Sequence, residues 1–519
     1  MLAKVKSVAV FGIDAYLLDI EIYIATGDMP YVAIVGLPDT AVKESRDRVK
    51  AAINTSGYRF PHKPMTINLA PADRKKEGPA FELPIAIGIL IATGQIGIQD
   101  VREYAIVGEL SLDGRLRPVK GCLSMALKCK ELGIKKLLAP SENVSEAAIV
   151  AGIDAIPVKT LADTVGILTG SIPAIPHKVT VEEIFKESGS YDVDYADVKG
   201  QEHAKRALTV AVAGNHNLIM VGPPGSGKTM LAQRIPTIMP SLTLEEALDT
   251  TRIYSIAGLL NPGQSLIATR PFRAPHHTIS TAGLVGGGSF PRPGEISLSH
   301  HGVLFLDELP EFDRKTLEVL RQPLETGSIT ISRAMSSVTY PASSVLVASC
   351  NPCPCGFYTD KQRPCRCTPH QIQNYMSKVS GPLLDRIDIQ LEVPAVRYGE
   401  LVADREAQSS DDMRKKVLAA RIMQKERFKD LLANHGQEQG IMVNARMSSK
   451  QVKKYCILDK PAETLLHQAM TDLGISARGH SKVLKVARTI ADIDESQIIK
   501  IDHISEAIQY RSLDRTLWK

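Results

Sequence analysis

Long apolar runs and secretion signals are missing from this sequence of 519 residues. No window approaches the roughly 18 uninterrupted apolar residues of a membrane-spanning helix, and the first residues lack the long apolar stretch and the cleavage site of a signal peptide. The 8 cysteines are too few over this length for a disulfide scaffold. These absences predict a cytoplasmic protein that does not associate with a membrane.

The sequence also has little excess charge of one sign. Its 62 Lys and Arg residues against 57 Asp and Glu residues leave a net charge of +5, which by itself does not indicate a nucleic-acid partner. A local basic channel is still compatible with that balance. The length leaves room for about three domains. With 44% apolar and 23% charged residues, the composition is ordinary for a globular protein with a sizeable core.

The most informative segment covers residues 217–232 and reads NLIMVGPPGSGKTMLA. A buried strand over Leu218–Val221 is predicted to run into a phosphate-binding loop, after which the pattern becomes helical. Glycines let backbone N–H groups close on phosphate oxygens, and the helix N-terminus adds partial positive charge. The alternative, a glycine-rich turn that binds nothing, is disfavoured because strand, loop and helix occur together. The loop consists of Gly222, Pro223, Pro224, Gly225, Ser226, Gly227, Lys228 and Thr229.

Two pairs of residues carry the predicted chemistry of ATP and Mg²⁺. Lys228 would reach the β and γ phosphates, and the Thr229 hydroxyl would hold Mg²⁺. A second apolar strand, Val303–Leu306, ends in Asp307 and Glu308. Asp307 would coordinate Mg²⁺ directly or through water, and Glu308 would orient and deprotonate the attacking water.

Two further positions resemble functional residues of AAA+ ATPases. A strand over Ser344–Ala348 ends near Asn351, which in that pattern senses the γ phosphate, although an Asn before Pro352 also favours a simple turn. The segment SGPLLDRID, residues 380–388, resembles the one that carries the arginine finger in the magnesium-chelatase and MCM helicase branch. The resemblance implies that Arg386 acts on a neighbouring subunit, so hydrolysis would require a ring. The alternative is that Arg386 only forms a salt bridge.

Two insertions resemble those that the same branch directs into its central pore. The glycine-rich stretch between Arg273 and Val303 is too long for an ordinary connection. Residues 327–340 read as a β-hairpin. Basic side chains there could touch a phosphate backbone, although basic residues on loops are most often only solvated. The candidates are Arg333, Lys315, His276 and His277.

Five of the eight cysteines lie between Cys350 and Cys367. Four thiolates can complete a tetrahedral shell around Zn²⁺ and stiffen a small loop, which predicts a structural ion and not a catalytic one. The tight Cys-x-Cys spacing matches no standard zinc finger, so a cluster without metal stays an alternative. The preferred ligands are Cys353, Cys355, Cys365 and Cys367, with Cys350 or His370 as replacements.

The N-terminal region reads as α/β, with a helix predicted over Thr40–Thr55. Two of its motifs, KEGPA at 76–80 and GELSLDGR at 108–115, resemble the proteolytic domain of Lon-type proteases. That family uses a Ser-Lys dyad, whereas this sequence has Ala80 and Leu123 at the corresponding positions. We therefore expect a retained fold that binds or assembles. Substitution of the dyad by the nearby Ser124 and Lys120 is a weaker alternative.

We expect an α/β protein in four parts. These are a Lon protease-like domain over 1–168, a linker over 169–195, an AAA+ ATPase core over 196–395 with a Cys-rich insertion at 350–370, and a helical linker and lid over 396–519. Helices are predicted in the last part, one of them over Asp411–Leu432. There Arg478, with Arg488 in reserve, corresponds to the second sensing arginine of AAA+ proteins, although an exposed helix arginine is also common.

Taken over nearly the whole chain, these segments resemble the bacterial ComM/YifB family of magnesium chelatase-like proteins. The resemblance implies an ATP-driven homo-hexameric DNA helicase that promotes branch migration during natural transformation, acts on single-stranded or branched DNA and works with recombination proteins. One alternative is a chelatase-type motor that remodels a protein partner. A Lon-like peptidase is disfavoured because its nucleophile and amine base are missing from the expected positions.

Overall fold

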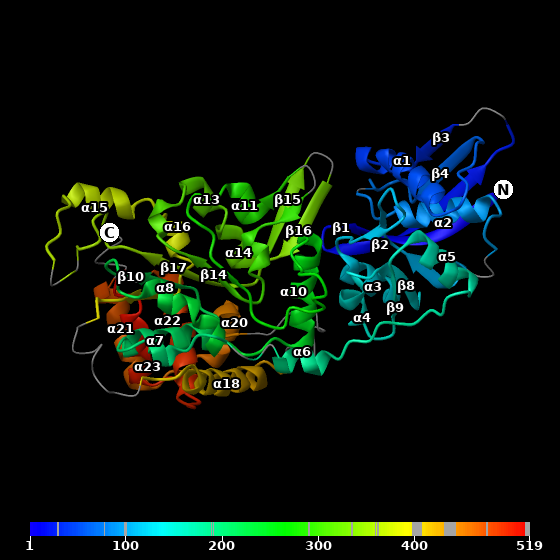
Figure 1. The fold of residues 1–519 in the computed structure, drawn as a ribbon. Helices are drawn as coiled ribbons and strands as arrows, with labels where there is room; N and C mark the ends of the chain where they lie inside the picture. The colour runs from blue at the N-terminus through cyan, green and yellow to red at the C-terminus, as the bar shows by residue number, and fades with distance from the viewer. Residues whose placement is uncertain are drawn as a thin grey trace. The chain divides into compact units, whose positions relative to one another are not determined.

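The structure is a computed structural model, and it describes all residues except 28–30, 77, 98–100, 188, 190, 289–290, 334–335, 359, 361–362, 397–406, 430–442, 474–475 and 514–519. The chain divides into two compact units (Figure 1). The first unit comprises Met1–Ser188, Leu244–Ala268 and Ala334–Tyr340, and the second comprises Gly189–Thr243, Thr269–Arg333 and Pro341–Lys519. The first boundary falls inside the predicted linker, while the limits of the four predicted domains stay a prediction.

The first unit is built on a seven-stranded mixed sheet with the order β3-β4-β2-β1-β5-β8-β9. β2 runs antiparallel to β1 and to β4, and the other neighbours pair in parallel. Side chains of β2 alternate between buried and partly exposed, as expected for a strand with one face on a core. The strands are β1 Leu2–Phe11, β2 Asp14–Ile24, β3 Val32–Val35, β4 Met65–Ala70, β5 Tyr104–Ile106, β8 Lys136–Pro140 and β9 Asp154–Val158.

Helix α1 of this unit spans Thr40–Thr55, as the sequence predicted, and the Asp39 side chain caps its first turn. α2, Glu82–Ala92, was not predicted, because it is apolar on every side and shows no helical period. β5 is followed by a short β6, Glu109–Leu110, which pairs with β7, Leu116–Arg117. The other helices are η1 Val101–Glu103, α3 Cys122–Glu131, α4 Val144–Ala148, α5 Leu161–Thr169, α6 Val181–Glu187 and α10 Leu244–Ala257.

Two of these helices, α6 and α10, lie in stretches for which no helix was predicted. α6 lies inside the stretch over 169–195 that was expected to be irregular, and acidic residues in its first turn favour a helix there. α10 belongs to the first unit although it follows the phosphate-binding loop in the sequence. It is attached there by Ser255, which donates a hydrogen bond to buried Glu146, and by an ion pair of 2.8 Å between Arg252 and Asp14.

The second unit contains a five-stranded, wholly parallel sheet with the order β11-β14-β17-β10-β18 (Figure 1). β10 and β14 have the predicted bounds, and all residues of both are buried. Continuous apolar runs of this kind are typical of parallel strands covered on both faces. The strands are β10 Leu218–Val221, β11 Phe272–Arg273, β14 Val303–Leu306, β17 Val345–Cys350 and β18 Ile389–Glu392.

Shorter elements follow in the same part of the sequence, and one of them, β16, belongs mostly to the first unit. The predicted hairpin is present as β15, Ser328–Arg333, and β16, Ser336–Pro341. The described part of the glycine-rich insertion forms α11 Thr281–Val285, β12 Gly286–Gly287, β13 Arg292–Pro293 and α12 Glu295–Leu298. The remaining elements are η2 Tyr195–Asp197, α7 Glu202–Gly214, α8 Lys228–Gln233, α9 Ile235–Ile238, η3 Leu309–Glu311, α13 Arg314–Glu318, α14 Arg321–Thr326, α15 Pro369–Met376 and α16 Gly381–Leu384.

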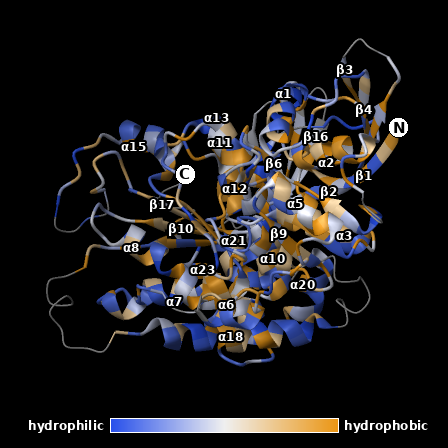
Figure 2. Cartoon of the chain, turned by 45° about the vertical axis from the view of Figure 1, so that its right-hand side comes forward, coloured by the Kyte–Doolittle hydropathy of each residue, from blue (hydrophilic) through white to orange (hydrophobic). Residues whose placement is uncertain are grey.

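The C-terminal part of the second unit is helical and shares a hydrophobic core with α7 and β10. The predicted helix over Asp411–Leu432 is α18, Ser410–Arg427, which carries apolar and polar residues in alternation along its length (Figure 2). The last predicted residues of that helix, 430–432, lie outside the described ones. The further helices are η4 Asn444–Arg446, α20 Ser449–Tyr455, α21 Lys460–Leu473, α22 Ala477–Ile493 and α23 Ile501–Gln509. Among the described residues, no helix is both long and apolar enough to cross a membrane.

A buried ion cluster holds the C-terminal helices together. Asp492 of α22 is fully buried and receives hydrogen bonds from Arg488, Arg427 and Asn444. The Arg488 guanidinium also donates to the carbonyls of Gln497 and Ser496. Removing the one carboxylate of this cluster would leave the buried Arg488 and the partly buried Arg427 without a compensating charge.

We predict that Asp492→Ala lowers the local unfolding free energy of α22 by about 3 to 5 kcal/mol, because breaking a buried ion pair leaves uncompensated charge. Hydrogen exchange of peptides from α22 measures this quantity directly. Asp472→Ala, at an exposed position of α21, is the matched control and should leave the exchange unchanged. Equal protection in the two variants would contradict the prediction.

Candidate nucleotide-binding site and cysteine cluster

The candidate site lies where β10, β14 and β17 end at the same edge of the sheet in the second unit. β10 runs into the glycine-rich loop, and α8 begins directly after it at Lys228. Gly225 and Gly227 have φ angles of 75° and 86°, which favour glycine. A Cβ atom on Gly222 would lie 2.1 Å from the carbonyl oxygen of Val393, so only glycine fits there. The loop thus has the backbone shape of a phosphate cradle.

Lys228 lies at the centre of this loop and is buried. Its Nζ donates to the carbonyls of Gly222 and Pro223 at 2.7 and 2.9 Å and lies 3.3 Å from Oδ1 of Asn351. Burial lowers the pKa of Lys228, whereas the nearby carboxylate of Asp307 opposes this shift. The structure therefore brings the predicted phosphate-binding lysine and the predicted sensing asparagine together.

Asp307 connects the phosphate loop to the neighbouring strands. Its Oδ2 accepts a hydrogen bond of 2.8 Å from the Thr229 hydroxyl. Its Oδ1 accepts one from the Ser349 hydroxyl and one of 3.0 Å from the backbone N–H of Glu308. Hydroxyl and carboxylate oxygens are hard ligands of the kind that Mg²⁺ prefers, so the donor set of Thr229 and Asp307 fits the ion.

Ser349 is a site residue that the sequence interpretation missed. Leu306 of β14 pairs with Ala348 of β17, and this register sets Ser349 opposite Asp307. The Ser349 hydroxyl also accepts a hydrogen bond of 3.3 Å from the Glu308 backbone N–H. The available signal was that Ser349 is a hydroxyl residue in an otherwise apolar, buried strand. The sequence could not identify Asp307 as its hydrogen-bond partner, because that pairing depends on the order of the strands in the sheet.

Glu308 has a left-handed backbone, with φ of 52° and ψ of 49°, an uncommon conformation for a residue with a side chain. Its carboxylate is half exposed, and Oε2 lies 3.8 Å from Nδ1 of His277. The His277 ring packs beside the ring of His276 and edge-on to Phe312. His277 was predicted as a pore residue, and in this chain it adjoins the candidate catalytic carboxylate.

Arg386 bonds to residues of its own chain. Its guanidinium forms an ion pair with Glu325 of α14 and donates to the carbonyls of Arg321 and Pro382. Arg478, at the start of α22, is largely exposed and has Nη1 3.7 Å from Oδ2 of Asp385. The structure therefore brings Arg478 to the residue that precedes Arg386, whereas its reserve, Arg488, is committed to the buried cluster around Asp492.

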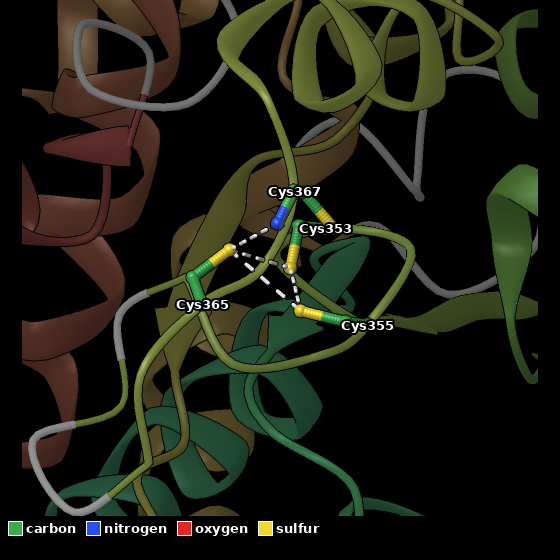
Figure 3. A group of neighbouring side chains, drawn as sticks. All are labelled: Cys353, Cys355, Cys365 and Cys367. Carbon is green, nitrogen blue, oxygen red and sulfur yellow. Dashed lines mark hydrogen bonds between the residues drawn. The ribbon is translucent and has the colours of Figure 1, made fainter.

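The four preferred zinc ligands gather in one place after β17 (Figure 3). Their sulfur atoms all lie within 4.8 Å of one another, and three of the pairs are separated by 3.3, 3.7 and 3.6 Å. Backbone N–H groups lower the pKa of Cys355 to about 6, whereas burial raises the pKa of Cys353 to about 12 and also raises that of Cys367. Among the described residues, the replacement ligands Cys350 and His370 are not part of this group, which is Cys353, Cys355, Cys365 and Cys367.

In the first unit, the two positions that correspond to the Lon dyad lie close to the core. Leu123 is fully buried and Ala80 packs partly against the same apolar clusters. The Ser124 hydroxyl donates a hydrogen bond of 2.8 Å to the carbonyl of Ile13, and Arg252 donates to the same hydroxyl at 3.4 Å. Lys120 packs beside Gly258, where a Cβ atom would lie 2.7 Å from its Cε.

Comparison with known families covers most of the chain. The family model described as magnesium chelatase, subunit ChlI, matches residues 194–401. A model for subunit ChlI of Mg-chelatase matches residues 20–143, and one for the C-terminal part of the same subunit matches residues 407–511. The first of these matches includes both strands and the loop of the candidate site.

Similar curated proteins span the full length. The chain is 42% identical over 517 residues to the protein YifB of Salmonella typhimurium, covering 99% of this chain and 98% of that protein. It is 42% identical over 526 residues to the competence protein ComM of Haemophilus influenzae, covering 100% and 99% of the two chains. A shorter match to Lon protease 2 of Bacillus subtilis is 28% identical over 202 residues and covers 36% of each chain.

We predict that Ser349→Ala raises the Mg²⁺ concentration needed for half-maximal binding of a fluorescent ATP analogue about tenfold, because groups that orient a metal ligand commonly have effects of that size. Binding is measured by titrating Mg²⁺ at a fixed concentration of the analogue. Ser344→Ala, at the residue before β17, removes a hydroxyl of the same kind and serves as the control. Identical Mg²⁺ dependence in both variants would show that Ser349 does not position Asp307.

Proposed function

Because the chain belongs to the ComM/YifB family of magnesium chelatase-like proteins, we propose that it is an ATP-driven helicase or translocase that promotes branch migration of recombining DNA. The observation that carries the ATPase part is the shared hydrogen bonding of Thr229 and Asp307, which joins the phosphate loop to the acidic strand end. ATP and Mg²⁺ are the proposed cofactors of this site, and the cysteine cluster is a proposed Zn²⁺ site.

The chain's own groups divide the work of hydrolysis between them. Lys228 binds the β and γ phosphates, and the loop N–H groups and the N-terminus of α8 add further donors. Thr229 and Asp307 hold Mg²⁺, which neutralises charge on the phosphates. Glu308 takes a proton from the attacking water, and Asn351 helps to hold that water beside the γ phosphate.

DNA as the substrate is supported by the relatives and by two loops. The name of the Haemophilus influenzae relative connects it with competence, and the 42% identity extends over its whole length. The hairpin β15–β16 and the insertion between β11 and β14 are of the type that reaches a central pore in related motors. We propose that they follow single-stranded or branched DNA during natural transformation in the cytoplasm, together with recombination proteins.

A homo-hexameric ring is proposed because of Arg386. A guanidinium supplied by the adjacent subunit stabilises charge on the transferred phosphoryl group. In that arrangement Arg386 exchanges its Glu325 partner for the γ phosphate of the neighbour. Arg478 of the helical lid is the proposed second sensing residue. The first unit is proposed to be a Lon protease-like domain without peptidase activity, which binds or assembles.

A chelatase-type motor that remodels a protein partner is the second candidate. The matching family models favour this second candidate, because their descriptions name a subunit of magnesium chelatase. It uses the same ATP site but gives no role to DNA. DNA stimulation of hydrolysis therefore separates the two candidates.

We predict that the purified full-length protein hydrolyses ATP and that forked or single-stranded DNA raises the rate several-fold. Lys228→Ala removes the phosphate-binding ammonium and Glu308→Gln removes the base, so each should reduce the rate at least about 100-fold. Lys425→Ala, at an exposed position of α18 outside the site, is the control for the loss of a lysine. Phosphate release is measured with and without DNA.

A high rate of ATP hydrolysis that does not change when DNA is added would contradict DNA as the substrate. It would favour a protein partner. Hydrolysis that survives both Lys228→Ala and Glu308→Gln would instead overturn the assigned site. Stimulation by DNA that both substitutions abolish supports the motor and leads to unwinding and branch-migration assays.

We predict that Arg386→Ala and Glu308→Gln, each inactive alone, restore activity when mixed. A subunit with Arg386→Ala keeps its own base, and a Glu308→Gln neighbour can still supply the arginine. An equal random mixture should reach about a quarter of the wild-type rate, because that share of interfaces has both groups intact in a closed ring. A mixture as inactive as its components would show that Arg386 acts only within its own chain.

A further inference from the structure

We propose that the cysteine cluster binds one Zn²⁺ and that the bound ion positions both Asn351 and the phosphate loop, so that zinc occupancy controls the rate of ATP hydrolysis. The part that concerns hydrolysis rests on the proposed ATPase function, whereas the metal site itself does not. Cysteine cluster here means Cys353, Cys355, Cys365 and Cys367.

The sulfur separations fit a tetrahedral zinc site. A tetrahedron with Zn–S bonds of about 2.3 Å has sulfur atoms about 3.8 Å apart. The separations of 3.3 Å between Cys353 and Cys355, 3.7 Å between Cys353 and Cys365 and 3.6 Å between Cys355 and Cys365 approach that value. A disulfide would need about 2.05 Å. All four thiols are free, so the four sulfurs have the spacing and the valence for one shared ion.

The segment that carries the cysteines, between β17 and α15, contains no regular secondary structure among its described residues. Its two Cys-x-Cys pairs are separated by nine residues. One contact of this loop is the Arg363 guanidinium over the ring of Phe357. Closing such a loop costs chain entropy, which metal–thiolate bonds offset. The ion would therefore fix the path of the chain on both sides of the loop.

Asn351, the residue predicted to sense the γ phosphate, lies at one end of this cysteine-containing loop. β17 ends at Cys350, and only Asn351 and Pro352 separate that strand from the buried ligand Cys353. The side chain of Asn351 lies 3.3 Å from Nζ of Lys228. A tether on Cys353 therefore limits how far Asn351 can move from the phosphate-binding lysine.

The turn between the first two ligands and the third lies against the phosphate loop. Gly356 has a φ of 85°, and its N–H donates a hydrogen bond of 2.9 Å to the carbonyl of Cys353. A Cβ atom on Gly356 would lie 2.5 Å from Cδ of Pro224. The approach is so close that a shift of the cysteine turn toward the phosphate loop must displace Pro224. The neighbouring Gly222 N–H already bonds to the Cys350 carbonyl at 3.2 Å, which ties the same two segments together.

Through these contacts the ion would position Asn351 and the phosphate loop, although it would not touch the nucleotide. Loss of zinc releases Cys353 and Gly356, and both sensor and phosphate loop lose a fixed neighbour. We expect kcat to fall about 10- to 100-fold, the usual range for a group that orients an active site. The KM for ATP should change less, since Lys228 and Thr229 still bind phosphate and Mg²⁺.

The experiment uses the full-length protein purified without chelator. Zinc content is determined by mass spectrometry for the wild type, Cys353→Ser, Cys365→Ser and the control Cys456→Ser, which changes a buried cysteine of the C-terminal helices. We expect one zinc ion per chain in the wild type and the control, and none in the other two variants. Replacement by Co²⁺ should give thiolate-to-metal absorption and the visible bands of a tetrahedral site.

Coupling to the nucleotide site is measured by hydrogen exchange and by hydrolysis. Removing zinc from the wild type should increase exchange in the peptide that covers residues 217–232 and lower kcat, and added zinc should reverse both changes. This reversal also covers the case in which a serine variant fails to fold. Wild-type protein without zinc and without a cobalt–thiolate spectrum overturns the metal site. Bound zinc whose removal changes neither exchange nor kcat overturns the positioning role.

The outcomes also distinguish a failure of the zinc proposal from a failure of the proposed ATPase function. If the wild type binds zinc and shows the expected change in hydrogen exchange but hydrolyses no ATP, the ATPase function fails while the metal site and its contact with the loop stand. If hydrolysis follows the predicted pattern in a protein that never binds zinc, only the present proposal fails.

Discussion

The parallel arrangement of five strands is the constraint on which the candidate site depends. Parallel neighbours end at the same edge of a sheet, so β10, β14 and β17 deliver their final residues to one place. The Asp307 carboxylate then accepts hydrogen bonds from Thr229, after β10, and from Ser349, at the end of β17. One side chain thereby fixes the relative positions of three segments that lie far apart in the sequence.

The two strands of this site and the residues that follow them could be predicted, because each is identified by residues that are adjacent in the sequence. β10 and β14 are short apolar runs followed at once by the residues that act, and such runs identify buried parallel strands without any knowledge of their neighbours. Ser349 could not be found this way, since its role comes from the register of β17 against β14. The proximity of the predicted pore residue His277 to Glu308 could not be found from the sequence either, because the two residues follow different strands, β11 and β14.

The helices differ in the same way, because some could be predicted from neighbouring residues and others depend on contacts with distant ones. α1 is amphipathic and capped by Asp39, so its bounds could be read from the sequence. α2 is apolar after its first residue, Glu82, and gives no period, and it becomes a helix because a core surrounds it. α10 joins the first unit through a hydrogen bond between Ser255 and Glu146, which are 109 residues apart. Neither composition nor periodicity contains such a pairing.

Each candidate catalytic residue also contacts an element that takes no part in the chemistry. Glu308 lies beside His277, near the start of the glycine-rich insertion, and Arg386 pairs with Glu325, three residues before the strand β15 of the hairpin. Asn351 is two residues from Cys353. Ion pairs and short tethers transmit displacement because they have few alternative geometries. A change in any of the three elements would therefore alter the position of a proposed catalytic group, and this would link the rate of the proposed hydrolysis to events outside the site.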